Sequence, residues 1–164
     1  MATDRAKRAL FRGKANAPLV VRPPHALAES QFTETCTRCE KCIAVCPTNI
    51  IVKGSGGFPE IDFGAGAKEC ELCNKCVEAC QDDALNAANE PVWRWQLTLN
   101  EQACLPFQGV ACRSCGEYCA DSAIRFQPKI GGQFTPELIL EACTGCGACI
   151  HPCPTNALQI QPAD

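Results

Sequence analysis

Three short segments of this chain carry the hydrophobic pattern of β-strands. Residues 92–99 read VWRWQLTL, in which the tryptophans and leucines alternate with polar side chains, as in a half-buried strand. Residues 50–63 (IIVKGSGGFPEIDF) and 123–134 (AIRFQPKIGGQF) each read as a short strand, a Gly-Gly turn and a second short strand. The pattern therefore predicts one single strand and two β-hairpins.

Four cysteine runs stand between and beside these segments at even distances. Three are spelled Cys-x2-Cys-x2-Cys-x3-Cys, and in the other, residues 104–119, seven residues instead of two follow the first cysteine. From the last cysteine of one run to the first of the next there are 23 intervening residues each time, which indicates internal duplication. Because Cys-x3-Cys sets two cysteines about one helical turn apart, we expect each run to be a loop that enters a short helix.

The segments that follow the runs sort them into two pairs. The predicted hairpins follow runs one and three, whereas Ala-Leu stands four and five residues past the last cysteine of runs two and four (Ala84-Leu85 and Ala157-Leu158). The chain therefore reads as two tandem bacterial-ferredoxin-like modules of α+β class, with short helices and hairpins around metal clusters. The predicted parts are a basic and flexible N-terminal arm, residues 1–30, a first module, residues 31–90, and a second module, residues 91–164.

Composition changes this picture by showing how little apolar core the side chains supply. With the 16 cysteines taken out of an apolar share of 46%, roughly 36% of the 164 residues remain apolar, below the usual share. Metal ligation can make up the difference, because binding at a site absent from the unfolded chain becomes folding energy. Zinc sites, disulfide scaffolds and metallothionein-like chains also use cysteine. Four even bursts with only two histidines, separated by strand-like segments, favour iron–sulfur clusters over all three.

The spelling of the runs is that of bacterial ferredoxins, in which the fourth cysteine of a run serves the other cluster of a pair. We therefore expect four [4Fe-4S] clusters, or three if residues 104–119 hold none. Sequential pairing of the runs groups the sixteen predicted iron ligands as Cys36, Cys39, Cys42 with Cys80; Cys70, Cys73, Cys76 with Cys46; Cys104, Cys112, Cys115 with Cys153; and Cys143, Cys146, Cys149 with Cys119. The rival is nested pairing, of run one with run four and run two with run three.

The altered third run still places a cysteine where a first ligand belongs. Cys104 keeps the 23-residue distance from the preceding run, so the change is an insertion inside the loop. We expect a bound cluster there, and expect it to be the most exposed and labile of the set. Leu105, Pro106 and Phe107 either cover that cluster or form part of a docking surface for a partner.

Smaller departures leave alternatives open. Gln81 and Ala120 replace the proline that follows the fourth cysteine in the other runs, which either alters hydrogen bonds to sulfur or is neutral. His151 lies inside the fourth run and is either a tuning residue or a polar side chain at its surface. His25 is expected to be exposed.

Charge is unevenly distributed along the chain. Residues 1–24 hold six Lys or Arg against Asp4, a net +5, which leaves −8 for the rest of a chain of net charge −3. An acidic body disfavours nucleic acid as a partner. The basic arm is either a solvated tail or a docking arm stiffened by Pro23 and Pro24.

A faint resemblance to a twin-arginine export signal is seen in Lys7-Arg8-Ala9-Leu10-Phe11, but charged residues and prolines interrupt any apolar run after it. We therefore expect a cytoplasmic protein without membrane insertion.

Taken together, the four runs, the lengthened gap in the third, the arm that ends in RPP, and the stretches CTRCEKCIAVC and CRSCGEYC resemble the NapF family. The resemblance covers nearly the whole chain and implies a cytoplasmic accessory protein of the periplasmic nitrate reductase system that carries [4Fe-4S] clusters. It further implies that the chain binds the molybdenum-containing catalytic subunit before export and assists its maturation, through assembly or reduction of that subunit's cluster.

Two other functions fit the same cysteine runs: a general ferredoxin-type electron carrier, and an electron-transfer subunit of a larger oxidoreductase. No catalytic base, nucleophile or nucleotide loop is recognisable, so we expect no enzymatic activity. The GSGG stretch at residues 54–57 is expected to be a turn, since no Lys-Ser/Thr follows it.

Overall fold

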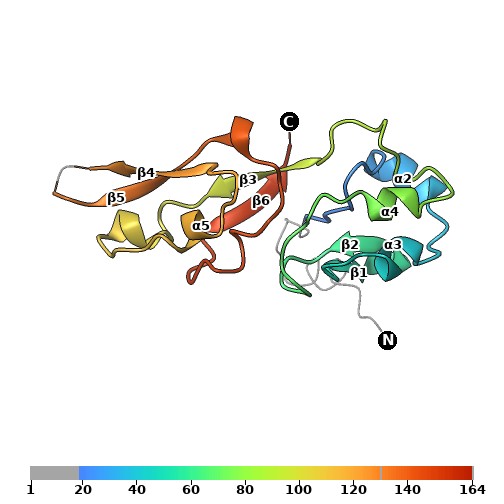
Figure 1. Ribbon diagram of the computed structural model, residues 1–164, viewed down its shortest axis with the longest axis horizontal. Helices are drawn as coiled ribbons and strands as arrows, with labels where there is room; N and C mark the ends of the chain where they lie inside the picture. The colour runs from blue at the N-terminus through green and yellow to red at the C-terminus, as the bar shows by residue number, and fades with distance from the viewer. Residues whose placement is uncertain (1–18, 130, 164) are drawn as a thin grey trace, which may run out of the picture. The chain divides into compact units, whose positions relative to one another are not determined.

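The computed structural model describes residues 19–129 and 131–163. Contacts divide the chain into two compact units (Figure 1). The first unit is formed by Met1–Asp62 and Asn74–Arg94, and the second by Phe63–Cys73 and Trp95–Asp164. The division therefore falls near the predicted junction at residue 90, but one loop, Phe63–Cys73, groups with the second unit.

Within the residues that the structure describes, the first unit combines three short α-helices with one hairpin (Figure 1). The helices are α2 (Glu29–Thr35), α3 (Lys41–Ala44) and α4 (Lys75–Glu78), and the strands are β1 (Ile51–Lys53) and β2 (Pro59–Ile61). β1 and β2 pair antiparallel with Ile51 opposite Ile61, which confirms the first predicted hairpin. The GSGG stretch forms its turn, a 3-10 segment at Ser55–Gly57.

The N-terminal side of this unit differs from the expected flexible arm. Residues 1–18 of that arm lie outside the described residues, but residues 19–30 pack into the first unit. Pro23 and Pro24 are fully buried and Val21 is buried, while the Ile61 amide donates to the Val21 carbonyl. The two prolines thus belong to a core and not to a free extended arm.

His25 is buried as well, contrary to the expectation that it would be exposed. Its side chain is 9% exposed, and Nδ1 lies 3.0 Å from the Asn89 carbonyl oxygen. The His25 amide donates to Val92, and its carbonyl accepts from Asn86 and from the Asn89 side chain. Sequence reasoning missed this role because every partner of His25 is more than sixty residues away along the chain.

Arg22 ties the same segment to helix α2 and to the hairpin. Its guanidinium donates to Glu29 and to the Pro59 carbonyl. It also lies over the rings of Phe32 and Phe58, at 5.0 and 5.4 Å from their centroids. Phe32 is completely buried, so Arg22 caps the apolar centre of the first unit.

The second unit contains two separate antiparallel strand pairs (Figure 1). Its elements are β3 (Trp95–Leu99), the 3-10 segment η2 (Leu105–Gln108), helix α5 (Ser114–Glu117), β4 (Ile124–Pro128), β5 (Phe134–Leu138), η3 (Leu140–Ala142) and β6 (Leu158–Pro162). β4 pairs with β5, which confirms the second predicted hairpin. β3 pairs with β6, Leu99 standing opposite Leu158, so the alternating tryptophan–leucine strand closes on the last strand of the unit.

The core of the second unit lies on the buried face of β3. Trp95 and Leu97 are buried there with Ile124 and Leu158, and the ring of Phe63 meets Trp95 edge-on at 5.5 Å between centroids. The alternation in residues 92–99 thus predicted the strand and its buried face. The predicted short helices exist in runs one to three as α3, α4 and α5, while run four forms turns.

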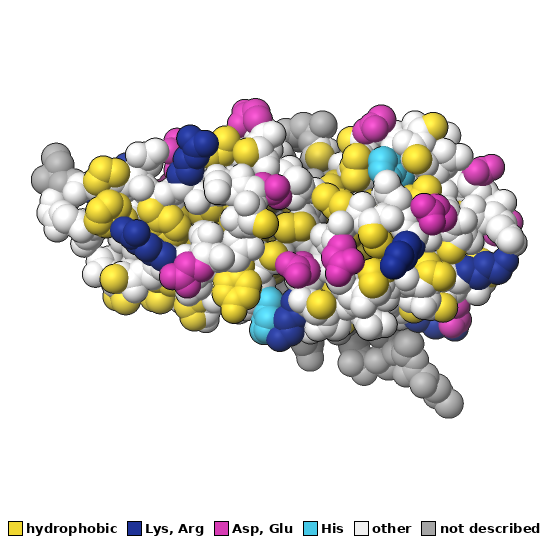
Figure 2. Space-filling model, in the orientation of Figure 1, with side chains coloured by type: hydrophobic (Ala, Val, Ile, Leu, Met, Phe, Trp, Pro, Cys, Tyr) yellow, Lys and Arg dark blue, Asp and Glu magenta, His cyan; other side chains and the backbone are white. Residues whose placement is uncertain are grey.

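Charged side chains of both signs are interspersed on the surface shown in Figure 2, and apolar side chains reach the surface over the region of β4 and β5. No helix among residues 19–129 and 131–163 is long and apolar enough to cross a membrane.

Candidate metal centres

The cysteines are the only residue type that recurs at every predicted site, and all of them are described by the structure. No disulfide bond joins any two of the sixteen. Fourteen are buried or of intermediate exposure, three of these being buried (Cys76, Cys104 and Cys149), and the other two, Cys39 and Cys73, are exposed. The cysteines are therefore free thiols, and most of them are at least partly shielded from solvent.

The first predicted group comes together in the first unit. Burial raises the pKa of Cys42, on helix α3, to about 11, and the nearby Cys36, Cys39 and Cys80 thiols add to the shift. Cys80 follows α4 and belongs to run two, so two runs of the same module meet at one place. Sequential pairing predicts this juxtaposition, whereas nested pairing would bring Cys80 to run three.

The third predicted group comes together in the second unit despite the insertion. Burial raises the pKa of Cys115, on helix α5, to about 11, and the nearby Cys104, Cys112 and Cys153 thiols raise it further. Cys104 is itself buried, with 7% of its surface exposed. The lengthened loop thus brings Cys104 close to Cys112, Cys115 and Cys153, as the sequential grouping predicts.

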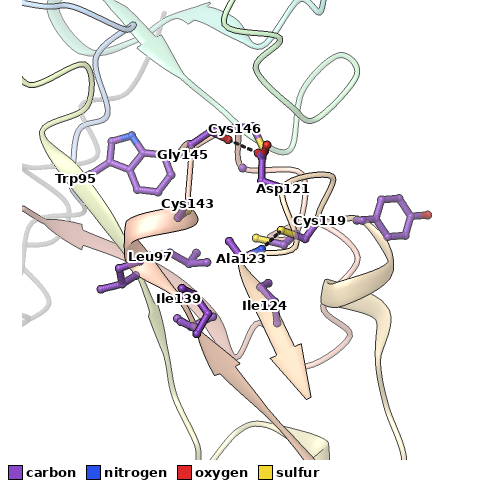
Figure 3. Close-up of a pocket in the computed structure, with 16 residues that line it drawn as sticks. Trp95, Leu97, Cys119, Asp121, Ala123, Ile124, Ile139, Cys143, Gly145 and Cys146 are labelled. Atoms are coloured by element: carbon purple, nitrogen blue, oxygen red, sulfur yellow. Dashed lines mark hydrogen bonds between the residues drawn. The ribbon is translucent and has the colours of Figure 1, made fainter. Parts of the chain in front are cut away.

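The fourth predicted group lies in a pocket of the same unit (Figure 3). Burial raises the pKa of Cys149 to about 12, and the Cys146, Cys143, Cys115 and Cys119 thiols add to the shift. Trp95, Leu97, Ile124 and Ile139 line the apolar side of this pocket. Since Cys115 belongs to the third group, the third and fourth groups are near neighbours, as in a dicluster module.

The second predicted group is divided between the two units. Cys46 and Cys76 belong to the first unit, while Cys70 and Cys73 belong to the second. Cys76 lies on α4 and is buried. The grouping of these four cysteines stays a prediction of the sequence.

The exposure of the third run was predicted wrongly. None of its cysteines is exposed, whereas Cys39 in run one and Cys73 in run two are. The cause is the insertion itself, because it folds into η2 and buries Pro106. Phe107 and Val110 remain outside, 37% and 50% exposed. The loop therefore shields the third group and leaves Phe107 and Val110 at the surface, while a docking role for it stays a prediction.

A turn with a left-handed residue follows the fourth cysteine of every run, and the sequence did not predict it. The residue three positions later has a left-handed backbone, with φ between 51° and 56° at Asn49, Asp83, Ser122 and Asn156. Asn and Asp tolerate this conformation better than other non-glycine residues. The turn directs a following backbone N–H at the cysteine sulfur, as in Ala123 to Cys119 and Ala157 to Cys153, both at 3.2 Å.

These features fit the chemistry of a [4Fe-4S] cluster. The donor set is four thiols per group, and N–H donors directed at sulfur stabilise thiolates and tune a cluster's potential. Among residues 19–129 and 131–163, no three His, Cys, Asp or Glu side chains converge as a site for a single metal ion. A cubane distributes its four thiolates over four irons, so it does not call for such convergence.

His151 contacts a partner outside its own run. Its Nε2 atom accepts from the Lys68 ammonium group, which lies on the loop Phe63–Cys73 of the same unit. The side chain is exposed. The interpretation of His151 as a polar residue at the surface of the motif agrees with this placement.

Comparison with known proteins gives matches over nearly the whole chain. Residues 35–85 and residues 110–157 each match a family described as a 4Fe-4S dicluster domain. The chain is 37% identical over 162 residues to the ferredoxin-type protein NapF of Escherichia coli K12, covering 98% of this chain and 97% of the relative. It is 41% identical over 140 residues to NapF of Haemophilus influenzae, covering 85% of this chain and 78% of the relative. It is also 31% identical over 169 residues to the methylamine utilization ferredoxin-type protein MauM of Methylobacillus flagellatus, covering 93% and 72%. The chain thus carries two dicluster ferredoxin domains and binds [4Fe-4S] clusters.

Proposed function

Because the chain belongs to the NapF family of ferredoxin-type proteins, we propose that it is a cytoplasmic accessory protein of the periplasmic nitrate reductase system. It binds the precursor of the catalytic subunit before export and assists that subunit's maturation, by helping to assemble or reduce its iron–sulfur cluster. It acts by binding and electron transfer, and not as an enzyme.

The observation that carries the proposal is the extent of the match. The similarity to NapF runs through 98% of this chain and 97% of the relative. The identity to NapF is also higher, at 37% and 41%, than the 31% identity to MauM.

The chain holds four clusters in this proposal, with all sixteen cysteines as iron ligands. In three of the four groups, one cysteine has its pKa raised first by burial and then by the neighbouring thiols of the same unit, which supports their proximity. In each group the chain's own contribution is to keep three cysteines of one run facing the fourth cysteine of its partner run. When bound, the clusters supply one-electron redox chemistry.

The docking surface in this proposal lies over the inserted loop. Phe107, Val110 and Phe134 are 37%, 50% and 43% exposed, and a groove beside them is lined by η2, by Arg113 and by the end of the β4–β5 hairpin. Arg113 lies 4.5 Å from the centroid of the Phe134 ring. Aromatic side chains and arginine are the residues that most often dominate binding energy at protein interfaces.

The test is capture of the unexported catalytic subunit. An affinity-tagged chain, purified without oxygen from cells that make the nitrate reductase precursor, should retain that precursor with its signal sequence intact. The matched control is the same chain with Phe107→Ala and Val110→Ala, whose iron content should be unchanged and whose capture should fall. Failure of the unaltered chain to capture the precursor under reducing, anaerobic conditions would contradict the accessory role.

The exposure of Cys39 and Cys73 favours a second candidate, a general ferredoxin-type electron carrier. Ligands that reach the surface shorten the path for an electron to a diffusing partner. In that case the chain should pass electrons to several unrelated acceptors at similar rates and retain none of them on a column.

A further inference from the structure

The four groups fall into two kinds according to the second residue after the fourth cysteine. That residue is a threonine after Cys46 and Cys153, and an aspartate after Cys80 and Cys119. The threonines follow the prolines of the motif, and the aspartates follow Gln81 and Ala120, where the proline is missing. The two departures from the ferredoxin spelling are thus linked to a change of side chain one position later.

The threonines direct a hydroxyl group at the cysteine sulfur. Thr48 Oγ1 lies 3.5 Å from Cys46 Sγ, and Thr155 Oγ1 lies 3.8 Å from Cys153 Sγ. Thr48 is 4% exposed, so its hydroxyl group has little access to water. Against an iron-bound thiolate, which has no proton to give, the hydroxyl must be the donor.

The aspartates instead accept from a threonine of the partner run. Thr37, next to Cys36, donates to Asp82 at 2.7 Å. Thr144, next to Cys143, donates to Asp121 at 2.8 Å. In both cases the bond joins the two runs that build one group, the first group in one unit and the fourth in the other. It also fixes a carboxylate beside the cysteines, as Figure 3 shows for Asp121.

From these contacts we infer that the chain holds two electrochemical classes of cluster, set by Thr48 and Thr155 in one class and by Asp82 and Asp121 in the other. A cluster gains one negative charge when it takes up one electron. A hydroxyl donor at a ligand sulfur stabilises that extra charge, and a fixed carboxylate opposes it. The groups of Cys46 and Cys153 therefore have the higher midpoint potentials, and the groups of Cys80 and Cys119 the lower. Each module then contains one cluster of each class.

This inference rests on cluster binding and not on the proposed partner, so its test needs the holoprotein alone. The full chain, with its clusters in place, is reduced stepwise by dithionite, which supplies one electron per cluster, and the reduced clusters are counted by electron paramagnetic resonance. The unaltered chain should titrate in two separate groups of midpoints.

The carboxylate arm compares Asp82→Asn with Asp83→Asn. Asparagine at position 82 still accepts from Thr37 but has no charge. Asp83 lies one residue further on and bonds to Asn86 instead, so its substitution removes the same charge without touching the Thr37 bond. At low salt, Asp82→Asn should raise one of the low midpoint potentials. At a fixed potential, the ratio of reduced to oxidised cluster should rise at least about threefold, which corresponds to roughly 28 mV at 59 mV per tenfold for one electron. High salt should shrink the shift, because Asp82 is exposed.

The hydroxyl arm compares Thr155→Val with Thr155→Ser. Valine removes the hydroxyl and should lower a high midpoint at any salt concentration, whereas serine keeps the hydroxyl and should restore it. Iron and sulfide per chain show that each variant has kept its clusters, and Thr155→Ser remains informative if Thr155→Val has not. A single midpoint for all clusters in the unaltered chain, a shift with Asp82→Asn no larger than with Asp83→Asn, or equal midpoints for the valine and serine variants would each overturn the inference.

Discussion

Replacing Cys80 with serine separates the two ways in which the runs can pair. Cys80 ends run two, yet the structure brings it to Cys42, Cys36 and Cys39 of run one. Serine is nearly the same size but is a poor iron ligand at neutral pH, so one cluster should lose its fourth ligand. A chain with four clusters carries about sixteen irons and sixteen sulfides, and the variant should carry about twelve of each.

The thiols set free by this change should react at very different rates. The thiolate is the reactive form, and the pKa of Cys42 is raised from 9.0 to about 11, mainly by burial, which the substitution leaves in place. At pH 8 about a tenth of a thiol of pKa 9 is ionised, against about a thousandth at pKa 11, so Cys42 should be alkylated about a hundredfold more slowly than an ordinary thiol. Because the pKa is raised, the rate should climb about tenfold for each pH unit from 8 towards 11. Cys39, which is exposed, should be labelled first.

The assay is alkylation of the anaerobic holoprotein with iodoacetamide, followed by peptide mass spectrometry. The matched control is Cys119→Ser, which should free Cys143 and its neighbours in run four and leave run one protected. If Cys80→Ser instead exposes Cys112 and Cys115 of run three while Cys39 stays protected, the runs pair in the nested manner and the reasoning from thiol proximity is wrong.

Three further predictions concern stability, metal content and the surface. Phe32→Ala should destabilise the first unit by about 3–5 kcal/mol, since the side chain is completely buried, while Phe107→Ala on the exposed loop should cost less than about 1 kcal/mol. Chemical unfolding of the holoprotein, followed by circular dichroism, measures both free energies. Equal costs for the two variants would contradict the described core. Stripping iron anaerobically with a chelator should abolish cooperative unfolding, because cluster binding supplies folding energy, and a metal-free chain that still melts cooperatively would contradict this. Phe107→Ala with Val110→Ala should reduce capture of the precursor at least about tenfold at unchanged iron content; undiminished capture would move the docking surface elsewhere.

Local pattern was enough to predict the hairpins and the buried face of β3. In each hairpin the two strands are joined by a short turn, with Ile51 opposite Ile61 in one and Ile124 opposite Leu138 in the other. Each strand and its pairing partner therefore lie within one short stretch of sequence. The partner of β3 was not predicted, because Leu99 pairs with Leu158 and nothing near either residue specifies the other. The spelling of the runs likewise predicted which thiols come together in the first, third and fourth groups, while their role as iron ligands stays a prediction.

The burial of His25 and of the two prolines before it could not be read from a basic segment. The hydrogen-bond partners of His25, such as Asn89 and Val92, come from the last segment of the first unit, more than sixty residues further along the chain. Charge counted along the sequence suggested a solvated arm, but Arg22 places its guanidinium over Phe32 and Phe58. A cation that packs on aromatic rings is counted as solvent-exposed charge in any composition argument, which is why that argument failed here.

The pairing of β3 with β6 has a consequence for the order of events during translation. Leu99 meets Leu158 in the finished sheet, so β3 leaves the ribosome 59 residues ahead of its partner, or roughly 3–12 s at usual elongation speeds. During that interval Cys104, Cys112 and Cys115 are already made while Cys153, their companion, is not. The first unit is completed earlier, because its last contributing segment ends at Arg94. A nascent chain can thus complete its first unit while the second still presents unfinished thiol sites, and the closing strand is what ends that vulnerable period.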